Sequence, residues 1–278
     1  MKSEIMEPDK SKASCQKVVI IQQADGLMYE QCLSISEGVI RYYCKKHGFT
    51  YWQIRGSVQD KRHRVWDKIL LIISALELGF DYVVWIDADM LLAQDEDIRK
   101  CLPQGKIIGA TYKNNGIDPP HYNAGFIVVR NNKISLDFFK KVWEIGNIDD
   151  IFKEQTTINS VNAENPVIVE VDNRWNYVEG IVPYIKNPVI FAWHGIPNRL
   201  SLIVKKKNKL YFTSRLYQEY LLDRAISFFR LTFVITIIRR IRKFFTMVLN
   251  FSKQERASRS FGKCLDCLKE QKQGQDEK

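Results

Sequence analysis

Several features that mark secreted, repetitive or membrane-spanning chains are missing from this sequence of 278 residues. It opens with polar residues rather than an apolar signal segment, and it shows no internal repeat. Its late apolar run, residues 225–238, has 14 residues and contains Arg230, whereas roughly 18 to 20 apolar residues are needed to span a bilayer. These absences favour a cytoplasmic globular protein over an exported or transmembrane one.

Cysteine is too scattered to suggest a disulfide framework. Only Cys264 and Cys267 have the spacing of a zinc-binding pair, and no second pair of Cys or His accompanies them. A reducing environment and two ordinary tail thiols are the simpler interpretation, with a zinc site as the alternative.

The positive charge of the chain lies in one late segment. The whole chain carries +10, residues 1–204 carry −1, and residues 205–243 carry +9. A nearly neutral body argues against nucleic-acid binding. Because the basic segment is also rich in apolar residues, it favours an anionic lipid surface as its partner.

Apolar periodicity predicts an alternation of strands and helices. Short continuous apolar runs predict buried strands at residues 17–22, 49–54, 82–86, 107–110, 126–129, 167–171 and 189–192. Apolar residues at helical spacing predict helices at residues 34–46, 65–78, 136–145 and 151–161. This order predicts an α/β fold with a mostly parallel, Rossmann-like sheet flanked by helices, in which ligands bind beyond the carboxyl ends of the strands.

Two carboxylates follow the most apolar of these strands. Asp87 and Asp89 stand two residues apart, so an extended backbone would point both side chains roughly the same way. Neighbouring ionised carboxylates at a half-buried strand end repel one another unless a cation shares them, and Mg²⁺ or Mn²⁺ suits oxygen ligands and substrate phosphates. The spacing predicts a divalent metal site. A solvated acidic turn, as expected for residues 95–97, is the alternative.

Five segments, in this order along the chain, resemble the motifs of GT-A glycosyltransferases, most closely the galactosyl and xylosyl transferase family with an Asp-x-Asp motif. The segments are Trp66-Asp67-Lys68, Trp85-Ile86-Asp87-Ala88-Asp89, the Asn123-Ala124-Gly125 triplet before an apolar strand, Glu154-Gln155, and Trp193-His194-Gly195. The likeness covers residues 17–198. Two features depart from the family pattern: the amino-terminal membrane anchor of the family's secretory-pathway members is lacking, and the end of the first strand, residues 22–25, is not a close match. The resemblance therefore specifies neither the base of the nucleotide nor the compartment.

The resemblance implies that Asp87, Asp89 and His194 hold Mn²⁺ or Mg²⁺. A packed structural histidine is the alternative for His194.

The resemblance also implies a set of residues that contact the nucleotide sugar. Lys68 would neutralise the phosphates, and Asp87, Ala88, Asp25 and Gly195 would make the other contacts. An ordinary surface lysine is the alternative for Lys68.

At the sugar, the resemblance implies catalytic roles for Asn123, Glu154 and Gln155. Small residues after Asn123 let the backbone approach a ligand, and the Asn123 amide can bond sugar hydroxyls. A tight strand entry without a ligand is the alternative for this triplet, and helix capping is the alternative for Glu154 with its neighbouring threonines.

Together these features predict a metal-dependent glycosyltransferase. It would move a hexose or pentose from a nucleotide-diphosphate sugar, a UDP-sugar, to a hydroxyl of a glycan or lipid-linked saccharide, with retention. A cation on the diphosphate would stabilise the charge that grows on the leaving group. A non-catalytic scaffold with a GT-A-like body, binding a nucleotide sugar or an anionic membrane, is the alternative.

The domain organisation expected from the sequence has three parts. Residues 14–210 would form the GT-A catalytic domain, residues 211–251 a basic amphipathic helical segment, and residues 252–278 a polar tail. Residues 225–245 would lie in the plane of an anionic membrane, on its cytoplasmic face. A helix that packs on the catalytic domain or in an oligomer interface is the alternative.

Overall fold

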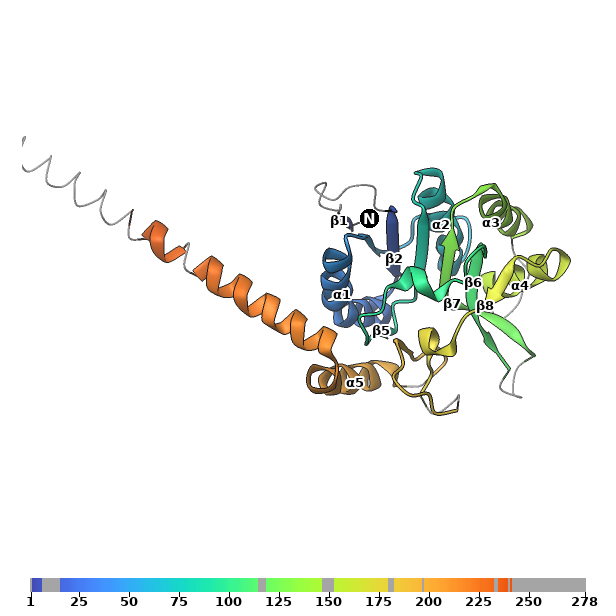
Figure 1. Ribbon diagram of the computed structural model, residues 1–278. Helices are drawn as coiled ribbons and strands as arrows, with labels where there is room; N and C mark the ends of the chain where they lie inside the picture. The colour runs from blue at the N-terminus through green and yellow to red at the C-terminus, as the bar shows by residue number, and fades with distance from the viewer. Residues whose placement is uncertain are drawn as a thin grey trace, which may run out of the picture. The chain divides into compact units, whose positions relative to one another are not determined.

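The computed structural model describes residues 2–6, 16–114, 119–146, 153–179, 183–196, 198–232, 235–239 and 241. The chain divides into two compact units, residues 1–221 and residues 222–278. The first unit contains a sheet with helices packed around it (Figure 1). The expectations for Cys264, Cys267 and the tail at 252–278 concern residues outside the described part of the chain, as does the start of the helix expected at 151–161.

A seven-stranded sheet forms the centre of the first unit. Its strands are β1 (Lys2–Met6), β2 (Val18–Ala24), β3 (Thr50–Arg55), β4 (Tyr82–Ile86), β6 (Ile108–Lys113), β7 (His121–Arg130) and β8 (Ile168–Glu170). Their order is β1-β3-β2-β4-β7-β6-β8, and all strands except β1 and β7 point the same way. The predicted α/β fold with a mostly parallel sheet is confirmed.

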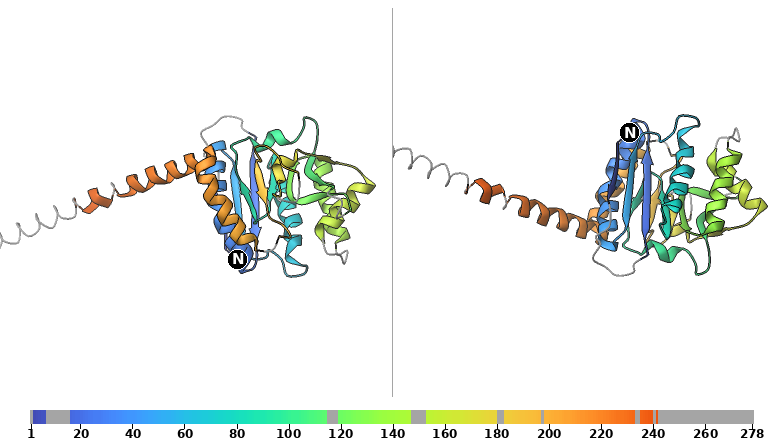
Figure 2. Two further views of the ribbon diagram at one scale, coloured as in Figure 1. Left: turned by 90° about the horizontal axis from the view of Figure 1, so that it is seen from below. Right: turned by 90° about the horizontal axis from the view of Figure 1, so that it is seen from above.

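Helices cover both faces of this sheet because successive strand residues point to opposite sides. In β2, Val18 and Ile20 belong to the core cluster that contains α1, whereas Val19 and Ile21 belong to the cluster that contains α2. The helices are α1 (Leu27–His47), α2 (Asp67–Glu77), α3 (Lys133–Ile145), α4 (Glu154–Glu164) and α5 (Arg199–Thr213). Figure 2 shows α1 on one side of the strands and α2, α3 and α4 on the other.

The predicted helix at 34–46 is real but begins seven residues earlier, at Leu27. Its first turn is exposed, with Leu27 at 76% of its full accessibility, so no apolar periodicity marks the start. The end agrees with the prediction, because Gly48 adopts the left-handed conformation that closes the helix.

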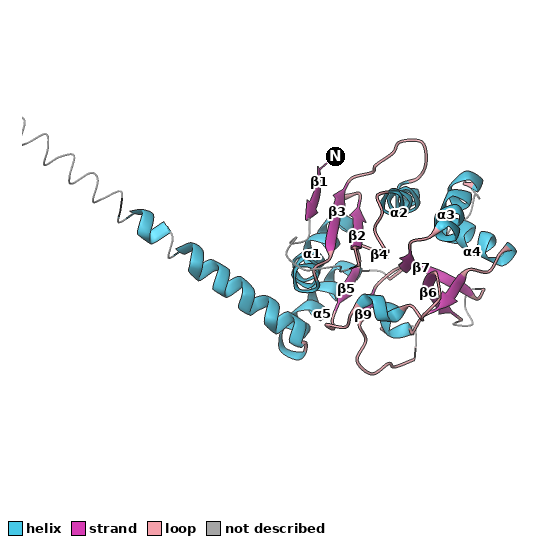
Figure 3. Cartoon of the chain, turned by 45° about the horizontal axis from the view of Figure 1, so that its top comes forward, coloured by secondary structure: helices cyan, strands magenta, loops and turns pink. Residues whose placement is uncertain are grey.

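A second, two-stranded sheet pairs β5 (Met90–Leu92) with β9 (Ile190–Ala192) in antiparallel fashion. The sequence analysis left residues 90–92 as an unassigned apolar stretch. This long-range pairing places the segment after Asp89 beside the segment before His194. Both strands are labelled in Figure 3. The two parts of the candidate site therefore meet through a contact between segments a hundred residues apart.

A helix at residues 215–232 crosses the division between the two units. Leu216, Tyr217 and Tyr220 are buried in the core of the first unit, beyond the boundary at residue 210 that the sequence suggested. The described residues of the second unit are helical throughout. In the described part of the chain, no helix has the length and apolar character needed to cross a membrane.

Candidate functional site

An open pocket lies at the carboxyl ends of β2 and β4 and encloses about 750 Å³, part of it open to solvent. Eight of the ten residues predicted for the site line this pocket: Asp25, Lys68, Asp87, Ala88, Asp89, Glu154, His194 and Gly195. The other two, Asn123 and Gln155, do not line it.

Asp87 is held directly at the end of the buried strand β4. Its backbone N–H donates to the Gly125 carbonyl at 2.9 Å, which fixes the strand end against β7. The indole of Trp85 donates to Asp87 Oδ1 at 2.6 Å, and Lys68 Nζ lies 3.4 Å from the same oxygen. The Asp87 carboxylate is therefore oriented by a neutral donor and balanced by a buried cation.

Asp89 is 3% exposed and pairs with a residue that the sequence analysis missed, Arg199 at the start of α5. Arg199 Nη1 donates to Asp89 Oδ2 at 2.6 Å. Burial, reinforced by the charge of Asp87, raises the pKa of Asp89 to about 6 in spite of Arg199. The charge of Asp87 thus disfavours the ionisation of Asp89, which is the electrostatic situation expected of a cation site.

Lys68 joins two carboxylates in a buried network. Its ammonium donates to Glu154 Oε1 at 3.0 Å and to the Ala124 carbonyl at 2.8 Å, besides facing Asp87. Burial opposes the charge of Lys68, but Asp87 and Glu154 outweigh it and raise the lysine's pKa. Burial also raises the pKa of Glu154, against the effect of Lys68. Lys68 is not the exposed lysine of the alternative interpretation.

His194 follows β9 and faces the same pocket as the two aspartates. Burial, assisted by the positive charges of Lys113 and Arg199, lowers its pKa to about 3. The imidazole is therefore neutral at physiological pH, and the neutral form is the one that binds a metal.

The side chains that line the pocket include groups with the chemistry of divalent-cation ligands. Asp87, Asp89 and His194 offer two carboxylates and one neutral imidazole to one cavity. Within the described residues, no three His, Cys, Asp or Glu side chains converge closely enough to hold an ion in this conformation. Arg199 instead occupies one carboxylate and Lys68 the other. A metal at this site would compete with Arg199 for Asp89.

The Asn123-Ala124-Gly125 triplet is built into the wall beneath the pocket. Gln155 Oε1 accepts from the Ala124 N–H at 2.8 Å, and Asn123 Oδ1 accepts from the Gly125 N–H at 3.0 Å. A Cβ on Gly125 would lie only 3.0 Å from Asn123 Oδ1 and 3.2 Å from Asp87 Oδ2. A larger residue would crowd both oxygens, so glycine favours this close approach, and Gln155 holds the backbone of the triplet by its hydrogen bond.

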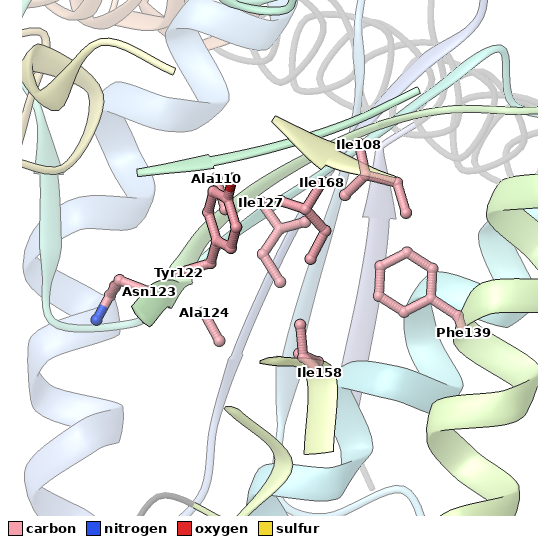
Figure 4. A pocket seen from close by; sticks show the side chains of 9 residues that line it. All are labelled: Ile108, Ala110, Tyr122, Asn123, Ala124, Ile127, Phe139, Ile158 and Ile168. Carbon is pink, nitrogen blue, oxygen red and sulfur yellow. The ribbon is translucent and has the colours of Figure 1, made fainter. Parts of the chain in front are cut away.

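A smaller cavity between the sheet and the helices α3 and α4 is apolar (Figure 4). Ile108, Ile127, Ile158, Ile168 and Phe139 surround it, with Asn123 at its edge. The side chains around it belong mainly to the core cluster on that face of the sheet. This cavity is a packing feature and offers no group for catalysis.

Arg199, Arg64 and Tyr29 are among the pocket residues that were not predicted from the sequence. Arg199 follows His194 by five residues, and this short separation of a basic side chain from a candidate ligand was the available signal. Arg64 pairs with Asp25 at 3.0 Å, and Tyr29 stands at the start of α1 with the guanidinium of Arg199 over its ring. No sequence signal distinguishes Tyr29, because its position depends on how α1 packs.

No protein-family model matches the chain, and no curated protein matches it by sequence. Solved structures do resemble it. One is a glycosyltransferase involved in the glycosylation of the major capsid of PBCV-1, with a TM-score of 0.57, 16% identity, and coverage of 68% of this chain and 99% of that one. Another is the apo form of the glycosyltransferase GlyE of Streptococcus pneumoniae TIGR4, with a TM-score of 0.52 and 12% identity. That match covers 76% of this chain and 64% of GlyE.

At these identities the likeness concerns the fold. The first unit has the fold of glycosyltransferases, as the sequence analysis predicted. The match to the narrower galactosyl and xylosyl transferase family stays a prediction.

Proposed function

We propose that the protein is a metal-dependent glycosyltransferase that transfers a hexose or pentose from a UDP-sugar to a hydroxyl of a glycan or lipid-linked saccharide, with retention. The observation that carries this proposal is the charged pocket at the ends of β2 and β4, where Asp87, Asp89 and a neutral His194 face one cavity. A glycosyltransferase fold around that pocket adds support.

The first role of the pocket would be to neutralise the negative charge of the donor diphosphate. Asp87, Asp89 and His194 would hold Mn²⁺ or Mg²⁺, which supplies electrostatic stabilisation to a diphosphate leaving group. Arg199 is paired with Asp89 at 2.6 Å. If a cation held Asp89, the Arg199 guanidinium would be available to phosphate oxygens, and Arg64 lines the same pocket.

Glu154 and Gln155 are proposed to act near the sugar in different ways. Glu154 lines the pocket with its carboxylate bonded to Lys68, so it presents negative charge beside the reacting centre. A fixed carboxylate there would stabilise the positive charge of an oxocarbenium-like transition state. Gln155 holds the Ala124 backbone and would act as a positioning residue for Asn123.

Ligand-dependent stabilisation tests this function directly. A ligand that binds only the folded protein raises the melting temperature, by an amount that grows with the logarithm of its concentration relative to its Kd. We expect UDP with Mn²⁺ to raise it by several degrees, and UDP with EDTA to raise it much less. Equal shifts with and without the metal would refute metal-dependent donor binding.

The alternative of a non-catalytic scaffold differs in turnover rather than in binding. Both proposals expect binding of UDP with Mn²⁺. Only the enzyme releases UDP continuously when supplied with a UDP-sugar and a saccharide acceptor, because each transfer frees one UDP. A protein that binds donors but never exceeds one UDP per chain would favour the scaffold.

For the second unit, we propose docking on the anionic cytoplasmic face of a membrane. Its described helical residues leave large apolar side chains in solvent, among them Leu222 at 61%, Phe228 at 66% and Phe229 at 69% exposure. The sequence places Arg239, Arg240 and two further basic residues directly after the apolar run. Apolar side chains among acyl chains and basic heads among anionic phosphates would satisfy both features.

A further inference from the structure

Every cation that lines the pocket has a carboxylate partner in the described structure. Arg64 pairs with Asp25 at 3.0 Å, Lys68 lies between Asp87 and Glu154, and Arg199 pairs with Asp89. Pairing of this kind is the rule for buried charges, because an unpaired ion loses its hydration without compensation.

Lys113 departs from this rule. It stands at the end of β6, is 7% exposed, and has no carboxylate within 4 Å among the described residues. The one hydrogen bond that its ammonium makes in the described part of the chain is to the Asn176 carbonyl, at a long 3.4 Å. Burial lowers the pKa of Lys113 to about 8, so the side chain is still mostly protonated at neutral pH.

Asn176, which supplies that carbonyl, is also incompletely satisfied. It is fully buried, and its side-chain nitrogen donates to Thr111 Oγ1 at 3.1 Å and to Asn123 Oδ1 at 2.6 Å. Its side-chain oxygen has no hydrogen-bond partner among the described residues. Among the described residues, a buried ammonium with one long hydrogen bond thus contacts a residue whose buried amide oxygen has none, and native structures seldom leave such an oxygen without a ligand or water.

These two residues adjoin the candidate active site. A Cβ placed on Gly125 would lie 3.2 Å from the Asp87 carboxylate and 3.7 Å from the Asn176 side-chain nitrogen, so a single glycine separates them. Among charged groups, Lys113 has the largest effect on His194. The carboxyl ends of β4 and β6 face the same edge of the sheet, which is why both sites lie there.

We propose that Lys113 and Asn176 form a subsite for an anionic, hydroxyl-bearing saccharide, either a sugar acid or a sugar phosphate. The Lys113 ammonium would donate to the carboxylate or phosphate, and Asn176 Oδ1 would accept from a neighbouring hydroxyl. The anion would supply the partner that the described residues of the chain do not. This inference rests on the proposed glycosyl transfer and specifies its substrate class. The anionic group belongs to the donor sugar or to the acceptor.

Calorimetric titration of the full-length protein with Mn²⁺ tests the proposal and separates these two sources. For the donor, UDP-glucuronate is compared with UDP-glucose. For the acceptor, glucose 6-phosphate and glucuronate are compared with glucose in the presence of saturating UDP. We expect one anionic probe to bind at least 10-fold more tightly than its neutral counterpart, which identifies the source.

The variant Lys113→Met keeps the length of the side chain and removes its charge. We expect it to abolish the preference for the anionic probe while leaving the affinity for UDP unchanged. Its melting temperature should equal or exceed that of the wild type, because an uncompensated buried charge is gone. Lys133→Met, at a lysine that is 86% exposed, is the matched control and should behave as the wild type.

Three results would overturn the subsite: no preference for any anionic probe in the wild type, a preference that survives in Lys113→Met, or a clear loss of thermal stability in that variant. The last result would assign Lys113 a structural role. Failure of the wild type to bind UDP with Mn²⁺ is a different outcome, which would remove the proposed function itself and the subsite with it.

Discussion

The pocket of the first unit and the helix of the second differ in what they bury. The pocket buries paired charges, whereas the helix leaves apolar side chains exposed. In the pocket, Lys68, Asp89 and Glu154 are buried and bonded to one another or to Arg199. In the second unit, by contrast, Phe228 and other large apolar side chains remain exposed. A charged ligand of the pocket must compete with an internal ion pair. A partner of the helix need only cover exposed apolar side chains. The pocket is therefore expected to be selective and the helix to respond to surface chemistry in general.

The largest expected effect concerns Asp89, whose carboxylate a cation would take from Arg199. Asp89→Asn should lower turnover by about 10³-fold or more, since a neutral amide is a poor ligand for Mn²⁺. Asp95→Asn is a matched control, because Asp95 pairs with Lys46 and His47 away from the pocket. Release of UDP from a UDP-sugar measures both variants. An Asp89→Asn variant within 10-fold of the wild type would contradict the proposed site.

The next largest expected effect is the loss of stability when Lys68 is removed from its ion pairs. Lys68→Met leaves the buried Glu154 and the partly exposed Asp87 without their cation and should lower the free energy of unfolding by about 3 kcal/mol. Lys141→Met removes an exposed pair with Glu164 and should change it by less than about 0.5 kcal/mol. Urea unfolding followed by circular dichroism gives both values. Equal values for the two variants would mean that the pocket pairs are no different from surface pairs.

A third effect should appear as a pH dependence. The pKa of Asp89 is raised on folding to about 6, so this group stabilises the fold below its ordinary pKa near 4, and that stability is lost as the pH rises through about 6. The stability of Asp89→Asn relative to the wild type should therefore increase between pH 4 and pH 7. The gain should be up to about 3 kcal/mol. A flat difference across this range would show that Asp89 ionises without cost.

The smallest expected effect belongs to the exposed helix. Replacing Phe228 and Phe229 by Asp should weaken binding to phosphatidylglycerol-containing vesicles by about 10-fold or more, because apolar burial is lost and negative charge is added. Leu78→Asp changes an exposed apolar residue of similar accessibility, 67%, in the first unit and should bind as the wild type. Vesicle co-sedimentation compares them. Equal loss in both variants would point to a general effect of charge, and no loss in either would remove the helix from membrane docking.

The local pattern of apolar residues was sufficient to predict the elements whose residues are continuously buried. The apolar run before Asp87 predicted β4 with the bounds it has, Tyr82–Ile86, because every residue in it is buried and the strand needs no distant information to be recognised. The start of α1 was not predictable in this way, since Leu27 and its neighbours are exposed and carry no period. Strand β1 was not expected, because it is defined only by its antiparallel pairing with β3.

The sequence by itself determined the sheet, the acidic strand end and most of the residues that line the pocket, because these follow from apolar periodicity and from motifs that are local in the chain. Only the tertiary structure decided how their charges are matched. The β5–β9 pairing brings Asp89, Arg199 and His194 to one cavity, and burial then determines which charges need partners. Lys113 gave no signal in the sequence, because a lysine with no counter-ion among the described residues is unusual only once it is buried.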